Sequence, residues 1–191
     1  MSNSMLPVYA AIIAAALAVA SALFTVTRQQ QAATLKERQQ VYAGIMGKKH
    51  LRNQLVVSRF EALIFSDYHE RRWRLAGAPA DSFDFQEAQR WMHKSEDLAL
   101  EIGRTNQSLF ESIGLARATF TSSPQLTDLT EKIYRFGTPR IAPPPEQQDQ
   151  QSLEQWKTEA VKQLQAWVER EYAQPTDALL TYLQQNMRTK L

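Results

Sequence analysis

The sequence predicts an all-α protein in which a single N-terminal membrane-spanning helix continues into an antiparallel helical bundle. Three observations predict this fold class. Residues 6–27 hold no charged side chain, apolar residues recur at helical spacing through most of the remaining chain, and only six glycines are present in 191 residues. Glutamine is abundant and runs of β-branched residues are short, which also favours helices over strands.

The uncharged segment 6–27 is long enough to cross a bilayer as a helix, because 22 residues that rise about 1.5 Å each span roughly 33 Å. A cleavable signal peptide is the alternative, since two small-x-small triplets lie between Ala18 and Ala22. However, no Lys or Arg precedes the segment, and the apolar run is longer than a typical signal core. We therefore expect residues 1–27 to form a retained anchor.

Charges beside the anchor predict its orientation. Arg28, Lys36 and Arg38 follow the apolar segment, whereas no basic side chain precedes it. The positive-inside rule then places the N-terminus outside and the soluble domain in the cytoplasm. A periplasmic domain held by an inner-membrane anchor is the alternative.

One face of the anchor is a candidate for helix packing. Ala14, Ala18 and Ala22 follow one another at every fourth position, a spacing that lets two helix backbones approach closely. This face predicts association with a second copy of the chain, and the alternative is that alanine only fills the span.

Residues 28–137 predict a helical stalk and a hairpin of two long helices. The stalk continues the anchor and is weakened locally at Gly44 and Gly47, and its helix ends at Gly77.

Sequence signals also predict where the next two helices begin. Asp84 and Glu87 have the spacing of a capping box at the start of the second long helix. Ser123 followed by Pro124 predicts the start of a short third helix, which Gly137 would close.

Residues 138–151 are typical of a linker, because three consecutive prolines favour an extended polyproline conformation and the residues after them are polar. Residues 152–191 then predict C-terminal helices. Ser152 and Gln155 have capping-box spacing, and Pro175 is expected to interrupt the helical pattern.

The sequence contains no motif of a catalytic or cofactor site. There is no cysteine, and none of the three histidines is preceded by glutamate at the Glu-x-x-His spacing of di-iron bundles. Glycine-rich phosphate loops and nucleophile elbows are also absent from the sequence. We therefore expect no metal and no cofactor. A hydrolase or transferase is the least favoured function, and it would use the polar residues His69, Glu70, His93 and Glu96.

Two basic clusters are candidates for a surface that binds a partner protein or lipid headgroups. The first cluster belongs to the segment DYHERRWR at residues 67–74, where Arg and Trp are residue types favoured at interfaces. The alternative for this cluster is a solvated helix end with local ion pairs. Nucleic-acid binding is not expected, because no groove of stacking aromatics is evident. The candidate residues are Arg71, Arg72, Trp73 and Arg74 in the first cluster and Lys48, Lys49 and Arg52 in the second.

These observations predict a single-pass membrane-anchored interaction protein. It would be an accessory, scaffold or assembly subunit whose helical domain binds another protein or a second copy. The alternative is a membrane-anchored sensor that binds a small ligand between its helices.

Overall fold

The computed structural model describes residues 6–135, 137–144 and 149–188, without the side chains of residues 6–10 and 12. Helices α1 (Leu6–Ala76), α2 (Phe83–Thr119), α3 (Pro124–Tyr134), α4 (Gln150–Val168) and α5 (Gln174–Gln185) account for most of these residues. A π-helical turn, η1 (Glu169–Ala173), joins α4 to α5. The described residues contain no strand, so the predicted all-α class is confirmed.

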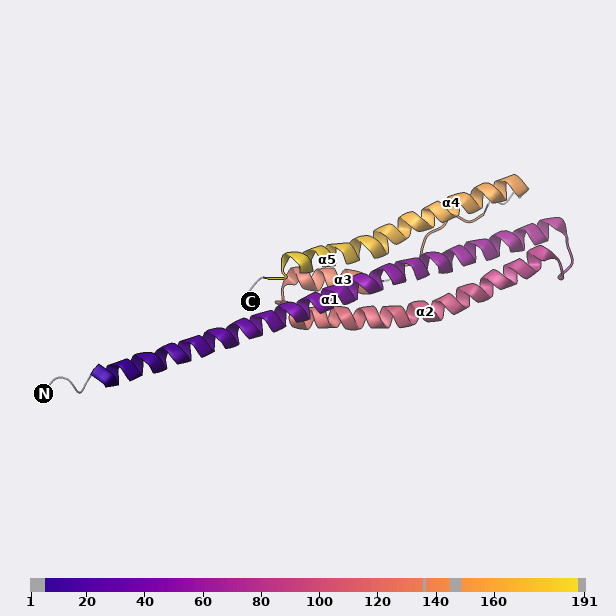
Figure 1. The fold of residues 1–191 in the computed structure, drawn as a ribbon. Helices are drawn as coiled ribbons and strands as arrows, with labels where there is room; N and C mark the ends of the chain where they lie inside the picture. Colours follow the sequence, from indigo (N-terminus) through magenta and orange to yellow (C-terminus); the bar gives the residue numbers. More distant parts are fainter. Residues whose placement is uncertain (1–5, 136, 145–148, 189–191) are drawn as a thin grey trace.

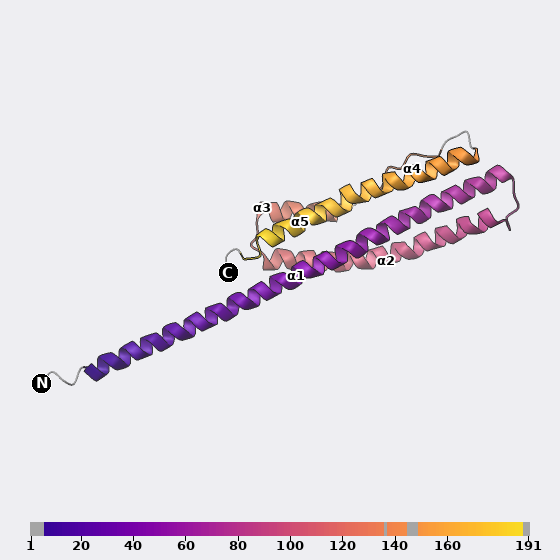
Figure 2. The same ribbon diagram turned by 45° about the horizontal axis from the view of Figure 1, so that its top comes forward.

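The helices form an elongated bundle around the C-terminal half of α1. Helix α2 runs antiparallel to α1 along one side, and α4 with α5 runs along another side (Figures 1 and 2). Helix α3 lies beside α5, at the end of the bundle that is nearer the N-terminus. The N-terminal part of α1 projects beyond this end as a single helix (Figure 1).

The predicted anchor over residues 1–27 lies partly outside the described residues, because residues 1–5 and the side chains of 6–10 and 12 are not described. Within the part of the chain that the structure describes, no helix combines the length and apolar character needed to cross a membrane. The large apolar side chains of the projecting helix are 49–65% exposed, and they are Ile13, Leu17, Val19, Leu23, Phe24 and Val26.

Helix α1 runs without a break through Gly44 and Gly47, so these glycines do not interrupt the stalk. A Cβ at Gly44 would lie 3.6 Å from the Ser112 hydroxyl oxygen, which is ordinary van der Waals contact, so the packing of α2 at this position does not require glycine. The end of the helix is as predicted, because Gly77 adopts a left-handed φ of 57° just after Ala76.

The predicted capping box of α2 is wrong. Ser82 occupies the N-cap, and its side chain makes no capping hydrogen bond. Asp84 instead binds His69 of α1, while Glu87 pairs with Arg90 of its own helix. The Asp84 carboxylate, which the local pattern assigns to the cap, therefore makes a tertiary contact with α1 instead.

The predicted start of α3 is confirmed. The Ser123 hydroxyl oxygen accepts a hydrogen bond from the Leu126 amide at 3.0 Å, and Pro124 stands in the first turn. The helix ends at Tyr134, before the predicted stop at Gly137.

The C-terminal helices differ from the prediction in two respects, the capping box at their start and the effect of Pro175. Helix α4 begins earlier, and its capping box pairs Asp149 with Ser152 rather than Ser152 with Gln155. Pro175 does not interrupt the helix, because the wider turn of η1 directly precedes it and the chain stays helical into α5. A π-turn relieves the clash and the missing hydrogen bond that proline imposes inside a helix.

Two apolar clusters form the core. One lies where α1, α2, α3 and α5 meet, near Ile45, Leu109 and Leu179. The other lies farther along α1, where α2 and α4 flank it near Val56 and Leu164. Ile141 of the segment 138–144 packs against the second cluster, and residues of both line the same groove.

Candidate functional site

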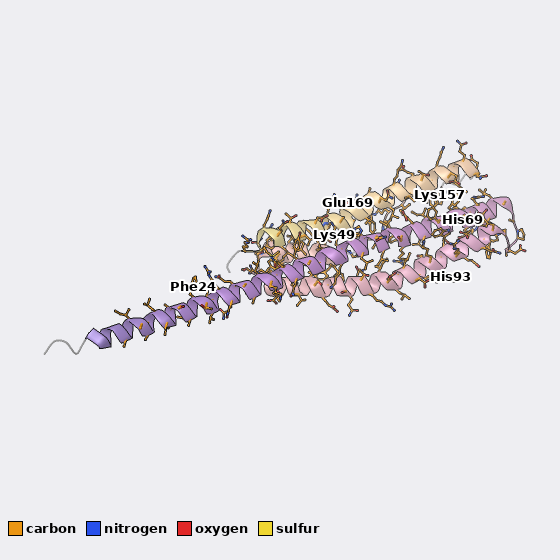
Figure 3. The ribbon with its side chains drawn as sticks, viewed as in Figure 1. Phe24, Lys49, His69, His93, Lys157 and Glu169 are labelled. Carbon is orange, nitrogen blue, oxygen red and sulfur yellow. The ribbon has the colours of Figure 1, made fainter. Side chains whose placement is uncertain are left out.

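The predicted cluster at residues 71–74 lies at the end of α1 that is far from the projecting helix (Figure 3). Its tryptophan is used in folding. The Trp73 indole nitrogen donates to the carbonyl oxygen of Ala78 at 2.7 Å, and its ring packs at 4.9 Å from that of Phe85. Trp73 therefore closes the turn between α1 and α2.

Two of the arginines beside it are engaged with neighbours. Arg72 lies 3.5 Å from the Asp84 carboxylate and donates to the Tyr68 hydroxyl at 3.3 Å. This hydrogen bond to Tyr68 is the main reason that the pKa of Arg72 is raised. Arg74 is exposed and pairs with Glu70 one turn earlier.

A polar network fastens α4 to this end of α1. The buried Tyr68 hydroxyl donates to Glu154, and Lys157 lies 2.6 Å from the same carboxylate and 4.1 Å above the Tyr68 ring. Burial raises the pKa of Tyr68, whereas the hydrogen bond from Lys157 lowers the pKa of Glu154. Glu154 and Lys157 carried no sequence signal, because only the tertiary fold brings them to Tyr68.

The second predicted cluster does not form a common surface. Lys48 donates to the Ser108 carbonyl at 2.9 Å and to the Ser112 hydroxyl at 2.7 Å, so it joins α1 to α2. Lys49 pairs with Asp177 of α5. Arg52, which is 1% exposed, is buried in the core, and its assignment to a surface is wrong.

The environment of Arg52 explains why a cation is tolerated there. One terminal nitrogen donates to the Tyr172 carbonyl at 3.1 Å and to the Thr176 hydroxyl at 3.0 Å, and the guanidinium carbon lies 4.9 Å from the Tyr172 ring centre. The other two nitrogens have no hydrogen-bond partner among the described residues. Burial therefore lowers the pKa of Arg52 to about 10.

Arg71 differs from these side chains because it lines a groove. The groove has a volume of about 420 Å³ and lies between α1, α2, α4 and the segment 138–144. Asp67, one turn before Arg71, lies at the same groove. Its apolar wall includes Phe60, Leu63, Ile64, Met92, Ile141 and Trp156.

The segment 138–144 is held over the groove by hydrogen bonds. The Trp156 indole donates to the Ala142 carbonyl at 2.9 Å, and the Ala142 amide donates to the Gln163 side chain at 3.3 Å. Residues 138–144 of the predicted linker 138–151 thus form one wall of the groove, which no local sequence signal indicated, whereas residues 145–148 of that prediction lie outside the described residues.

The polar residues named for an enzyme are dispersed. The imidazole of His69 lies 2.8 Å from Asp84, whereas His93 lies 3.4 Å from Glu96 on an exposed face of α2. No group of three potential metal ligands occurs among the described side chains. Asp67 and Arg71, by contrast, line one apolar groove, so this groove is the candidate functional site.

Comparisons with protein family models, with curated proteins and with solved structures find no match for this chain. The functional argument below consequently depends on the geometry of the bundle and of the projecting helix.

Proposed function

We propose that this chain is a single-pass membrane-anchored helical interaction protein, an accessory, scaffold or assembly subunit of a membrane-associated complex. The observation that carries the proposal is the helix that projects beyond the bundle (Figure 1). Its described large apolar side chains, from Ile13 to Val26, are exposed. Soluble proteins rarely leave such a continuous apolar surface open to water, and a helix that is apolar all round needs an apolar environment.

The few polar side chains of this helix support the same proposal. The hydroxyl of Thr25 donates to the Ser21 carbonyl at 2.9 Å, and the hydroxyl of Thr27 donates to the Leu23 carbonyl at 2.8 Å. Hydroxyls that bond within their own helix need no external partner, which is a requirement inside hydrocarbon.

The proposed orientation has the N-terminus outside and the bundle in the cytoplasm, with a periplasmic bundle as the alternative. It depends on the basic residues Arg28 and Lys36 that follow the apolar segment. Fusing a topology reporter after Leu191 tests it, because a reporter that is active only outside the cytoplasm separates the two orientations.

A protein partner fits the residues at the far end of α1 better than lipid does. Arg71 follows Thr27 by 44 positions on an unbroken helix, which corresponds to about 66 Å. Lipid headgroups at the base of the helix are far from Arg71 at that distance. In the anchor itself, the exposed face of Ala14, Ala18 and Ala22 is a proposed contact between two copies.

Two matched substitutions test the anchor. Leu17 on the projecting helix and Leu100 on α2 are 65% and 68% exposed, so arginine at either position creates little steric conflict. Arginine at the centre of a membrane helix costs about 3 kcal/mol of insertion free energy. We expect Leu17→Arg to reduce the membrane fraction that resists alkaline extraction, while Leu100→Arg leaves it unchanged. Equal behaviour of the two variants would refute the anchor.

The interaction role has its own experiment. The full chain, tagged after Leu191 and isolated from membranes, should retain a stoichiometric partner protein or a second copy through chemical cross-linking. A chain that remains a monomer without a cross-linked partner would contradict the interaction role but not the anchor.

A further inference from the structure

The groove at the far end of the bundle combines an apolar wall with two side chains of opposite charge. Leu63 and Ile64 of α1, Ile141 of the segment 138–144 and Trp156 of α4 form part of the wall. A volume of about 420 Å³ lies within the range of small-molecule sites, and such sites are mostly apolar with a few polar groups that fix orientation.

Asp67 and Arg71 differ from the charged residues around them. Their neighbours are paired, Arg72 with Asp84, Arg74 with Glu70 and Lys157 with Glu154. Asp67 and Arg71 stand one helical turn apart, yet neither makes an ion pair or hydrogen bond with a described residue. Two opposite charges that lie near each other without direct contact can each accept a group of a ligand.

The residues around Asp67 and Arg71 also affect how strongly these two side chains can bind a ligand. Partial burial of the Asp67 carboxyl raises its pKa, and the positive charge of Arg71 opposes this rise. Asp67 is an exposed residue that lines the groove, so a cationic group of a ligand can reach its carboxylate. Arg71 is partly buried at the same groove, where an anionic group pairs more strongly with its guanidinium than on an open surface.

We propose that this groove binds a free α-amino acid with a large apolar side chain, whose ammonium group pairs with Asp67 and whose carboxylate pairs with Arg71. A simple anion bound at Arg71 would be repelled by the Asp67 carboxylate, and a simple cation bound at Asp67 would be repelled by the Arg71 guanidinium. A zwitterion satisfies both charges. Side chains four positions apart on a helix have Cβ atoms about 6 Å apart, so they can converge on adjacent groups of one small ligand.

The apolar side chain of the amino acid then lies against the wall near Trp156 and Ile141. This inference goes beyond membrane anchoring and protein interaction and does not depend on either. It assigns a ligand to the bundle, so that occupation of the groove would join the segment 138–144 more firmly to α1.

The test is calorimetric titration of the full chain, kept in solution by an amphipathic polymer, with phenylalanine, tryptophan, leucine and methionine. We expect saturable binding of at least one of them. N-acetyl and carboxamide derivatives of that amino acid, which lack the ammonium and the carboxylate charge respectively, should each bind about tenfold more weakly or worse, because each loses one charge-assisted contact.

Variants of the chain give the complementary test. Asp67→Asn and Arg71→Gln should each weaken binding about tenfold or more, whereas Arg90→Gln, which changes an exposed arginine paired with Glu87 on α2, should leave it unchanged. Helical circular dichroism confirms that each variant is folded. The proposal is overturned if none of the four amino acids binds at concentrations up to about 10 mM. It is also overturned if binding survives both substitutions.

Discussion

Replacing Arg52 by methionine tests how a buried guanidinium without a carboxylate partner is accommodated in the core. Methionine keeps most of the length of the arginine stem and removes the charge and the hydrogen bonds. Alanine at the same position removes the stem as well. The two variants therefore separate the contribution of the charged group from the contribution of packing.

The structure supplies the terms of the estimate. Burial lowers the pKa of Arg52 to about 10, so at pH 7 the charged form costs about 3 kcal/mol relative to the unfolded chain. Two hydrogen bonds from the charged donor, to the Tyr172 carbonyl and the Thr176 hydroxyl, each stabilise the folded state by about 1.5 kcal/mol, and methionine loses both. The contact with the Tyr172 ring adds about 1 kcal/mol.

These terms nearly cancel, so we expect Arg52→Met to change the free energy of unfolding by no more than about 1.5 kcal/mol. The Tyr172 carbonyl keeps one donor after the substitution, because the Thr176 hydroxyl lies 2.9 Å from it. Arg52→Ala also leaves a cavity, and we expect it to be about 2–4 kcal/mol less stable than the methionine variant.

Guanidinium unfolding of the full chain, followed by tryptophan fluorescence, measures both variants. Trp167 reports on the site, because its ring lies 5.2 Å from that of Tyr172. The sign of the pH dependence is a second readout. A lowered pKa means that the unfolded chain holds this proton more tightly, so the wild type should gain stability as pH rises through about 10, and the methionine variant should lack this gain.

Two results would refute this reasoning. A loss of more than about 3 kcal/mol in Arg52→Met would mean that the charge contributes far more than its burial costs. Equal losses in the methionine and alanine variants would mean that the stem of Arg52 contributes nothing to packing.

Substitutions at three further sites, two of them with a matched control, test local features of the fold. Arg38→Ala removes a guanidinium that donates to the carbonyls of Thr119, the last residue of α2, and Met187, in the turn after α5. We expect the free energy of unfolding to fall by about 2 kcal/mol and amide exchange to become faster at these two helix ends, and neither change in Lys36→Ala. Unchanged exchange would contradict this role. Ser123→Ala should cost about 1–2 kcal/mol in thermal unfolding through the lost cap of α3, and a neutral result would show that the cap is dispensable. Gly77→Ala should lower the free energy of unfolding by about 1 kcal/mol, because Gly77 has a left-handed φ of 57°. Gly114→Ala should raise the free energy of unfolding by as much as about 1 kcal/mol, because open space surrounds this helical glycine. The opposite order of the two variants would refute the conformational argument.

The helices could be predicted from the sequence because burial repeats with the helical period, as at Leu109, Ile113 and Ala116. The positions of charged residues could not. Arg52 is buried by the arrival of α5 and η1, which lie more than a hundred residues later in the chain. Periodicity alone assigns such a residue to the surface.

The candidate site was predicted only in part, for a similar reason. Arg71 carried a signal as one member of a dense basic cluster, but its neighbours Arg72 and Trp73 proved to be engaged in the fold. The groove itself forms only where Trp156 and the segment 138–144 come to lie beside residues of α1, which are distant in the sequence.

The unbroken course of α1 gives the bundle a mechanical property. Val26 and Asp67 are 41 positions apart on one helix, which corresponds to about 60 Å. A straight rod of that length acts as a lever, so a tilt of about 10° at its base carries Asp67 sideways by about 10 Å. A small reorientation of the projecting helix is thereby enlarged at the groove, and a force applied at the groove reaches the projecting helix with a correspondingly long arm.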